Sequence, residues 1–478
     1  MNALNSLEYQ LKPDDQLCYI HIPKTAGSTL TAIADANFDV RTIAPAPRHL
    51  ADVNPAAKTA NTPEAIADLL THYRLIRGHF SYNEIRKVLR RPVYMTVLRD
   101  PVDRVISVYE FFRRAGDRGE AETHEYERLM AAASHDLLHF VQHSDPIVRR
   151  RTCNYQTHQV AGWQGNPSAF FELSEAEQWD AAQRSLETFA WVGLTERFQD
   201  SVFLLSYRFG WYPALEYQSL RVVTKKSRRA GISEDVIAAI AAQNQLDIAL
   251  YQSAKQRFER QFAQMLLALD QFPLDPLNPD QLKTSLERHY EQRFVAAHPT
   301  PCTALDFDFR QAALGTGWHR RNGGFNGIKA TGSWFRWTGP GTVSTLDFPL
   351  ATKTDLTVRL QISNAIAVDL LDSLTLTVNA QPIKLLPIKS TPNNQATSGS
   401  TVGRSRLLHG IIPRAALVSV RGFVRLTFGV NRTAPISSIT PNQADTRLVG
   451  VAIRRLELVP RASWWNWLKR LWPQWRDR

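Results

Sequence analysis

Cysteine is scarce in this sequence of 478 residues, and long apolar runs are absent. The cysteines Cys18, Cys153 and Cys302 are odd in number, widely spaced and form no CxxC pair, which excludes a disulfide framework and a cysteine-based zinc motif. No stretch of about 18 apolar residues occurs, and the polar segment Met1–Gln16 contains no apolar signal run. We therefore expect neither a membrane span nor a secretory signal.

Motifs for binding nucleic acid are also missing. There is no zinc-finger spacing, no RNA-recognition aromatic motif and no basic helix with heptads, so we expect no nucleic-acid partner. The chain is nevertheless basic, with a net charge of +12 and an isoelectric point near 9.7. This charge indicates a different anionic partner, such as an anionic cofactor, an acidic polysaccharide or a membrane surface.

An apolar run at residues 18–22 leads into a loop that contains lysine, glycine and hydroxyl residues, and a helical pattern follows. The start of a helix binds phosphate through unpaired N–H groups and its positive dipole end. Lys24 adds a charge there, and Ser28 and Thr29 add hydroxyl donors. Because Lys24 precedes Gly27, the order differs from the P-loop of nucleotide triphosphatases. Taken alone, the segment also fits an ordinary strand-turn-helix.

A second motif follows the apolar segment Val93–Leu98, a predicted buried strand that runs into Arg99, Asp100 and Pro101. Asp100 can cap the next helix and Pro101 can be its first residue. An apolar face formed by Val102, Val105, Ile106, Tyr109 and Phe112 turns Ser107 to the other side, where we expect it to meet a ligand. The alternative for Arg99 and Asp100 is a local salt bridge with a cap.

Together the two motifs resemble the cofactor site of sulfotransferases that use 3′-phosphoadenosine 5′-phosphosulfate (PAPS). Residues 23–29 are similar to the loop for the 5′-phosphosulfate, and Arg99 with Ser107 is similar to the pair that binds the 3′-phosphate. Residues 77–81, 154–162 and 192–198 extend the resemblance to the branch of heparan sulfate and uronyl 2-O-sulfotransferases, over roughly residues 15–265. The resemblance implies PAPS binding by Lys24, Thr25, Ala26, Gly27, Ser28, Thr29, Arg99, Ser107 and Thr195.

A basic run at residues 221–229 extends this expected cofactor site. In the family a basic loop covers the nucleotide phosphates, which makes Arg221, Lys225 and Lys226 candidates for cofactor binding. The alternative for this run is a solvated stretch of charge.

Sulfuryl transfer resembles phosphoryl transfer, in which positioning and charge stabilisation do most of the work. Lys24 and Arg99 provide cations for the leaving phosphate, with Lys24 acting in catalysis. A histidine suits the base that activates the acceptor hydroxyl. We expect this base to be His79, which the resemblance supports, with His21 as the competitor. His158 and Arg77 are tentative substrate contacts; both differ from the family pattern, which has arginine and histidine at these positions, so the substrate stays open.

His135, His139 and His143 recur every four residues, which is a spacing of zinc ligands on a helix. No glutamate follows His135 as a metalloprotease requires, and the expected donor chemistry needs no metal. We therefore interpret the three histidines as a helix face and expect no metal.

The first half of the chain alternates strands and helices, which predicts a parallel sheet flanked by helices over residues 15–272. The resemblance implies that this is the P-loop-like sheet of a sulfotransferase fold. Ligands of such sheets bind at the carboxyl ends of the strands. Besides the segments above, the pattern predicts strands at 75–78 and 189–194 and helices at 64–73, 81–89, 122–143, 175–187 and 233–272.

Prolines then bracket a short helical stretch at residues 273–302, which we interpret as a linker. Alternating apolar residues over 303–460 predict an antiparallel β-sandwich of jelly-roll type. It resembles a sandwich module appended to sugar-acting enzymes. Trp318, Trp334 and Trp337 either stack on sugar rings or belong to the core of this module.

The tail at residues 461–478 has tryptophan and basic residues at helical spacing. The segment Trp464–Trp475 fits a helix at a membrane interface, or one docked on a protein surface. The animal relatives are Golgi proteins with a membrane anchor; without an apolar anchor segment, we expect a cytoplasmic protein, peripheral at the inner face of the membrane. The sequence leaves open whether the chain forms a homo-oligomer.

Two functions fit these observations. The first is a PAPS-dependent O-sulfotransferase acting on a carbohydrate, either a polysaccharide or a glycolipid, and the second is a degenerate sulfotransferase-fold protein that binds glycans or assembles polysaccharide machinery. The presence of Lys24, His79, Arg99 and Ser107 together favours the enzyme. A kinase would also need a carboxylate for Mg²⁺, and the nearby Asp100 has the position of a helix cap.

Overall fold

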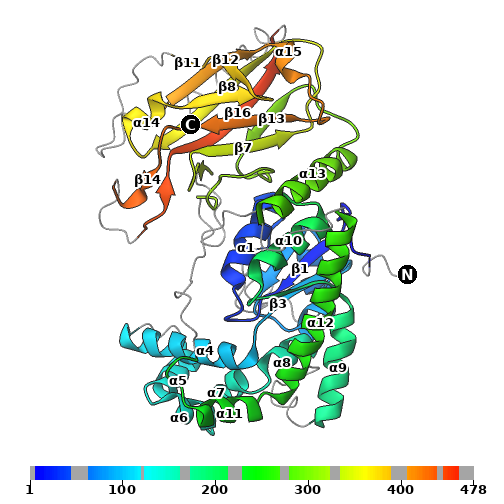
Figure 1. Ribbon diagram of the computed structural model, residues 1–478, viewed down its shortest axis with the longest axis vertical. Helices are drawn as coiled ribbons and strands as arrows, with labels where there is room; N and C mark the ends of the chain where they lie inside the picture. The colour runs from blue at the N-terminus through cyan, green and yellow to red at the C-terminus, as the bar shows by residue number, and fades with distance from the viewer. Residues whose placement is uncertain are drawn as a thin grey trace. The chain divides into compact units, whose positions relative to one another are not determined.

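The computed structural model describes residues 6–44, 63–119, 123–161, 173–213, 229–269, 279–322, 334–388, 406–438 and 445–461. The chain divides into two compact units (Figure 1). The first consists of Met1–Ala34 with Arg41–Leu286, and the second of Asp35–Val40 with Glu287–Arg478. The division after Leu286 falls within the stretch 273–302, the expected linker.

The first unit is built on a parallel sheet of four strands, β1 (Gln16–Ile20), β2 (Leu75–Gly78), β3 (Pro92–Leu98) and β4 (Phe189–Leu194). Their order is β2-β1-β3-β4, and all neighbours run parallel. All strand residues except Pro92 are buried. Continuous apolar runs of this kind belong to sheets that are covered on both faces. The predicted parallel α/β architecture is therefore confirmed.

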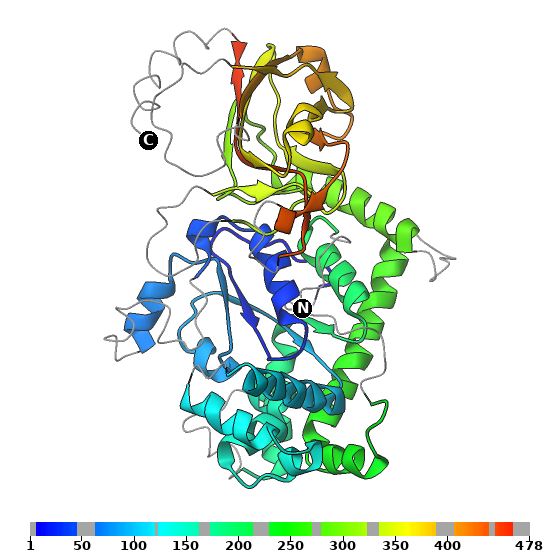
Figure 2. The same cartoon turned by 90° about the vertical axis from the view of Figure 1, so that its left-hand side faces the viewer.

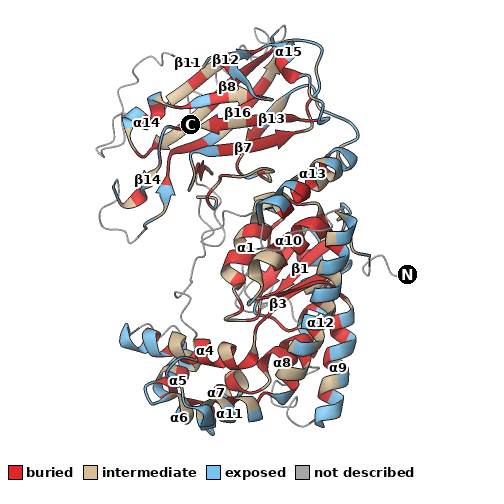
Figure 3. Cartoon of the chain, viewed as in Figure 1, coloured by how far each residue is buried: buried red, intermediate tan, exposed pale blue. Residues whose placement is uncertain are grey.

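The helices that follow these strands are α1 (Gly27–Ala36), α3 (Tyr82–Arg86), α4 (Pro101–Asp117) and α10 (Phe198–Phe209). The first unit further contains α2 (Pro63–Leu70), α5 (His124–Ala133), α6 (Leu137–Gln142), α7 (Pro146–Thr152), α8 (Tyr155–Ala161), α9 (Glu175–Glu187), α11 (Glu234–Ala242) and α12 (Gln245–Ala268). Figures 1 and 2 both show α4 to α7 and α11 as one group of helices, joined by two apolar clusters. Figure 3 shows that buried residues fill the sheet and the inner helix faces.

Two of the predicted helices are wrong as single elements, because side-chain caps divide them. The stretch 122–143 forms α5 and α6, and the Asp136 carboxylate accepts the His139 N–H at 2.8 Å to start α6. The stretch 233–272 forms α11 and α12, and the Asn154 side chain caps the start of α12 by accepting the N–H groups of Leu246 and Asp247, both at 3.1 Å. The other helices lie where predicted, although α2 ends at Leu70 and α3 at Arg86.

In its described residues, the second unit contains two larger antiparallel sheets and a separate pair of two short strands. One has the order β10-β9-β13-β7 and the other β11-β12-β8-β16-β5, with β6 paired to β16. Strand β5 pairs with β16, β7 with β13, β8 with β12 and β9 with β10, so the pairs are nested along the chain. This nesting is the strand order expected of a jelly roll. The strands are β5 (Leu305–Asp308), β6 (Arg336–Trp337), β7 (Val343–Phe348), β8 (Leu356–Ala365), β9 (Thr375–Val378), β10 (Gln381–Ile383), β11 (Leu386–Pro387), β12 (Arg406–Ile412), β13 (Val424–Gly429) and β16 (Val451–Pro460).

The other α-helices and strands of the described residues are the 19-residue helix α13 (Pro279–Ala297), the short helices α14 (Val368–Asp372) and α15 (Arg414–Leu417), and the strand pair β14 (Ala434–Pro435) and β15 (Leu448–Val449). Among the described residues, no helix has both the length and the apolar character needed to cross a membrane. The predicted tail helix, Trp464–Trp475, lies outside the described residues.

The core of the second unit lies between its two sheets and includes Phe307, Leu360, Leu376 and Phe428. Trp337 and Trp334 are buried. Trp318 packs on Phe309 and Phe428, with ring centroids at 4.8 and 5.7 Å, and its Nε1 donates to the Thr345 carbonyl at 2.7 Å. Trp334 and Trp337 are thus buried, and the half-buried Trp318 packs against the core, which favours the core interpretation.

Candidate functional site

The predicted site residues follow the four parallel strands of the first unit at their carboxyl ends. The loop 23–29 comes after β1, His79 directly after β2, Arg99 directly after β3 and Thr195 directly after β4. Since all four strands are parallel, these carboxyl ends meet at one edge of the sheet. The sheet thus brings four separate segments of the sequence to the edge where ligands of such folds bind.

The loop after β1 is held in an unusual backbone conformation. Lys24 and Ala26 have φ angles of 74° and 65°, in the left-handed region. The buried Thr25 hydroxyl donates to the Ile22 carbonyl at 2.8 Å and closes the loop. Helix α1 begins at Gly27, so that its first N–H groups and the positive end of its dipole lie at the end of the loop. Ser28 is half-buried and Thr29 buried in its first turn.

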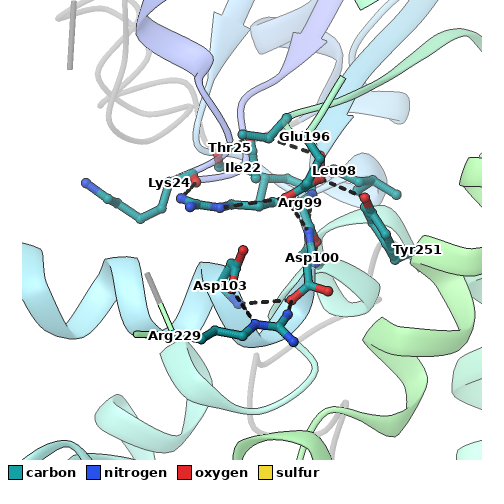
Figure 4. A network of polar contacts seen from close by, with 12 residues as sticks. Ile22, Lys24, Thr25, Leu98, Arg99, Asp100, Asp103, Glu196, Arg229 and Tyr251 are labelled. Atoms are coloured by element: carbon teal, nitrogen blue, oxygen red, sulfur yellow. Dashed lines mark hydrogen bonds and ion pairs between the residues drawn. The ribbon is translucent and has the colours of Figure 1, made fainter. Parts of the chain in front are cut away.

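Arg99 connects this loop to β3 (Figure 4). Its Nη1 donates to the Lys24 carbonyl oxygen at 3.0 Å, although the two residues are far apart in the sequence. Its Nε lies 4.0 Å from the Glu196 carboxylate, after β4. The Lys24 Nζ lies 4.5 Å from the centre of the Phe111 ring on α4. The two motifs that the sequence analysis singled out separately are therefore one constellation.

Asp100 caps α4 as predicted, because its carboxylate accepts the Asp103 N–H at 3.0 Å. Arg229 donates to the Asp103 carboxylate at 2.8 Å and to Asp100 as well (Figure 4). Arg229 is the last residue of the basic run 221–229. The candidates Arg221, Lys225 and Lys226 lie outside the described residues, so the described end of the run pairs with the start of α4 beside Arg99.

Ser107 is buried, as are Arg104 and Val108 on the same helix. Two apolar clusters join α4 to α5, α6, α7 and α11, and Ser107 belongs to neither of them. The residues of the predicted apolar face of α4 all belong to these clusters, and Ser107 lies away from that face. The contact of Ser107 with a ligand stays a prediction.

His79 forms a hydrogen bond that fixes its tautomer. Its Nδ1 lies 2.8 Å from the main-chain oxygen of His21. A carbonyl oxygen can only accept, so Nδ1 carries the proton and the lone pair of the neutral ring is at Nε2. The His79 ring packs on the His21 ring with centroids 4.4 Å apart, and His21 stacks on Tyr19 at 5.4 Å. His79 itself is exposed, while His21 is half-buried.

The tentative substrate residues are engaged inside the fold. The buried Arg77 guanidinium donates to the Ala44 carbonyl at 2.9 Å. His158 is also buried, and burial, together with the charges of nearby arginines, lowers its pKa to about 4. Thr195, in contrast, is half-buried at the sheet edge, where its hydroxyl donates to the Leu98 carbonyl at 3.2 Å.

Two further carboxylates support the edge and were missed by the sequence analysis. Glu196 accepts the Asp100 N–H at 3.0 Å and the Tyr251 hydroxyl at 2.7 Å (Figure 4), and burial raises its pKa. Asp247 lies on α12 and accepts from the start of α8. Neither has a sequence signal beyond its charge, because the partners come from distant segments.

The three spaced histidines form a row of rings, with centroids 4.3 Å apart for His135 and His139, and 5.4 Å apart for His139 and His143. They do not share one continuous helix, because the cap at Asp136 breaks it. Within the described ranges, no group of three or more histidine, cysteine, aspartate and glutamate side chains could hold a metal ion.

Comparison with known proteins relates part of the first unit to sulfotransferases. Residues 8–164 match the model of the sulfotransferase family. Heparan sulfate 2-O-sulfotransferase 1 of Gallus gallus is 27% identical over 146 residues, covering 26% of this chain and 38% of that protein. The Xenopus laevis protein is 25% identical over 224 residues, covering 41% and 56%, and the Homo sapiens protein is 24% identical over 216 residues, covering 40% and 54%.

The chain spans about half the length of the curated relatives it matches. A solved family GH115 4-O-methyl-alpha-glucuronidase aligns with 88% of this chain and 48% of its own, at 11% identity and a TM-score of 0.16, which is too low to indicate a shared fold. The family model and the curated relatives confirm the predicted resemblance of the first unit to the sulfotransferase family and to its heparan sulfate 2-O-sulfotransferase branch.

Proposed function

We propose that this chain transfers a sulfuryl group from PAPS to a hydroxyl group of a carbohydrate. The observation that carries the proposal is the hydrogen bond from Arg99 to the Lys24 carbonyl, which joins the predicted halves of the cofactor site at the carboxyl edge of the sheet. Names of the curated relatives support a carbohydrate acceptor.

The groups at this edge fit a cofactor with two phosphorylated positions. Lys24 and the first N–H groups of α1 suit the 5′ side, and the guanidinium of Arg99 suits the 3′-phosphate. Ser107 is proposed to assist Arg99 from α4, although it is buried. When bound, PAPS supplies a sulfuryl group whose bond to the phosphate oxygen breaks as the bond to the acceptor oxygen forms.

His79 acts in this proposal as the general base. Its Nε2 takes the proton of the acceptor hydroxyl, while Nδ1–H remains bonded to the His21 carbonyl. That carbonyl dipole stabilises the imidazolium that results. Lys24 and the positive end of the α1 dipole stabilise the negative charge that develops on the leaving phosphate. No metal takes part in these roles.

Binding of the product nucleotide tests the cofactor assignment. We expect adenosine 3′,5′-bisphosphate to bind at least about tenfold more tightly than ADP in calorimetric titrations, because a charged hydrogen bond to the 3′-phosphate contributes about 1.5 to 3 kcal/mol. Arg99→Ala should reduce this preference. Equal affinities of the wild-type protein for the two nucleotides would contradict the assignment.

Turnover tests the base. We expect His79→Ala to lower sulfuryl transfer from labelled PAPS by about two to four orders of magnitude, while its affinity for adenosine 3′,5′-bisphosphate stays unchanged. His72→Ala, at an exposed histidine of the same unit, is the matched control. Full turnover in His79→Ala rejects this base. The wild type is also assayed with a panel of polysaccharides and glycolipids. If it binds the nucleotide but sulfates none of them, the second function is favoured, a glycan-binding protein with a degenerate site.

The proposal also includes a cytoplasmic protein that associates with the membrane surface through Trp464–Trp475, a segment outside the described residues. Flotation with anionic liposomes tests this association. The full chain should float, and a chain without residues 461–478 should not; equal flotation of the two rejects it.

A further inference from the structure

The Gln156 side chain is bonded to both main-chain groups of Arg99. Its Nε2 donates to the Arg99 carbonyl at 2.8 Å, and its Oε1 accepts the Arg99 N–H at 2.9 Å. Gln156 is 0% exposed. Strand β3 ends at Leu98, and the Gln156 amide therefore supplies Arg99 with the two bonds that a neighbouring strand would otherwise supply.

Gln156 is itself held by a pair of helices that cap each other. The Asp247 carboxylate on α12 accepts the N–H groups of Gln156 and Thr157 at 3.1 and 2.7 Å, at the start of α8. In return, the Asn154 side chain accepts the N–H groups of Leu246 and Asp247 at the start of α12, both at 3.1 Å. The carboxylate also accepts the Thr157 hydroxyl at 2.7 Å.

Through these hydrogen bonds, the position of α8 determines the position of the Arg99 main chain. Asp247 and Thr157 are both fully buried, so the caps are shielded from water. With both main-chain groups of Arg99 fixed, its side chain leaves the sheet edge from a defined place and reaches the Lys24 carbonyl. A shift of α8 would move the Arg99 main chain with it.

We propose that Gln156 is a positioning residue that acts through the main chain of Arg99 and sets the preference of the site for a nucleotide with a 3′-phosphate. This inference rests on the proposed function, because it takes Arg99 as the partner of that phosphate. It also assigns a role to Gln156 in the segment 154–162, in which the sequence analysis had named only His158 as a candidate.

Replacement of Gln156 by an isosteric apolar side chain tests the inference. Gln156→Met keeps the volume and removes both bonds to Arg99. The matched control is Gln178→Met on α9, since Gln178 is also buried and donates to a main-chain carbonyl, that of Leu173, at 2.9 Å. Adenosine 3′,5′-bisphosphate and adenosine 5′-monophosphate are titrated into each protein by calorimetry, and thermal unfolding confirms that each is folded.

We expect Gln156→Met to bind the bisphosphate about tenfold more weakly than the wild type does, because the displaced Arg99 side chain loses one hydrogen bond to the 3′-phosphate. Its affinity for the monophosphate should equal that of the wild type. Gln178→Met should bind both like the wild type. Gln156→Glu, which keeps an acceptor for the Arg99 N–H, should recover part of the preference, and it replaces Gln156→Met if that variant does not fold.

The outcomes separate the two proposals. If the wild type prefers the bisphosphate and the Gln156 variants keep the full preference, or lose affinity for both nucleotides equally, the positioning role is wrong and the proposed function stands. If the wild type shows no preference for the 3′-phosphate, the proposed function fails, and this inference fails with it.

Discussion

The imidazole of His21 occupies the space that a side chain on Gly27 would need. A Cβ atom at Gly27 would lie 1.9 Å from Nε2 and 2.0 Å from Cδ2 of His21. The sequence analysis considered Gly27 only as part of a loop expected to bind phosphate. The structure gives Gly27 another reason, since its missing side chain leaves room for the ring that packs on His79.

Gly27→Ala should therefore destabilise the protein, against the helix preference for alanine. Alanine in a helix is favoured over glycine by about 0.5 to 1 kcal/mol, whereas overpacking costs about 1 to 3 kcal/mol. Urea unfolding of the wild type, Gly27→Ala, His21→Ala and the double variant measures the coupling. In the His21→Ala background the clash is gone, and Gly27→Ala should be neutral or stabilising. An equal cost in both backgrounds would show that His21 is not the obstacle.

At Ala26, in contrast, a substitution should stabilise the protein, because this residue has a left-handed backbone conformation. Ala26 has a φ of 65°, and a left-handed conformation costs a residue with a Cβ about 1 to 2 kcal/mol. Because glycine adopts it freely but loses about 0.5 to 1 kcal/mol in backbone entropy, Ala26→Gly should raise the free energy of unfolding by about 0.5 to 1 kcal/mol. Ala34→Gly in α1 is the control and should lower the free energy of unfolding. Thermal unfolding compares the two variants, and a change of the same sign in both would show that the Ala26 backbone is not strained.

The strands and their carboxyl ends could be predicted from the sequence because buried parallel strands are short apolar runs. Leu75–Gly78 and Phe189–Leu194 have the predicted bounds. Helix α9 also has its predicted bounds, and Ser174 caps it through the Glu177 N–H. These features depend on neighbours in the chain, so local patterns are sufficient to find them.

Features that depend on distant segments could not be predicted in this way. The burial of Ser107 is one of them, because the apolar pattern of its own helix does not predict it. The hydrogen bond from His79 to His21 joins the ends of two strands, β1 and β2. The break at Asp136 was visible in principle, since aspartate is a common N-cap, but the histidine spacing favoured one continuous helix.

The burial of His158 makes stability depend on pH. Its pKa is lowered to about 4 in the folded protein, mainly by burial, and is about 6.5 in an unfolded chain. Between these values the unfolded state binds more protons, so the stability is complete above about pH 6.5 and falls by about 2 to 3 kcal/mol as the pH drops to about 4.

His158→Gln cannot titrate, and its free energy of unfolding should change less between these two pH values. Chemical unfolding at a series of pH values measures the slope, with His72→Gln at an exposed histidine as the control. A wild-type slope retained in His158→Gln would assign the pH dependence to other groups.

The buried tryptophans of the second unit should contribute to the stability of the fold and not to the binding of a ligand. Trp337 is 2% exposed and part of the core between the two sheets. We expect Trp337→Ala to lower the free energy of unfolding of this unit by about 3 to 5 kcal/mol, because it leaves a large cavity. Val420→Ala, at a fully exposed residue, should stay within about 0.5 kcal/mol. Calorimetric unfolding compares the two. If Trp337→Ala loses both stability and glycan binding, the loss of binding results from unfolding. If it loses glycan binding at unchanged stability, Trp337 is a sugar contact and the core interpretation is wrong.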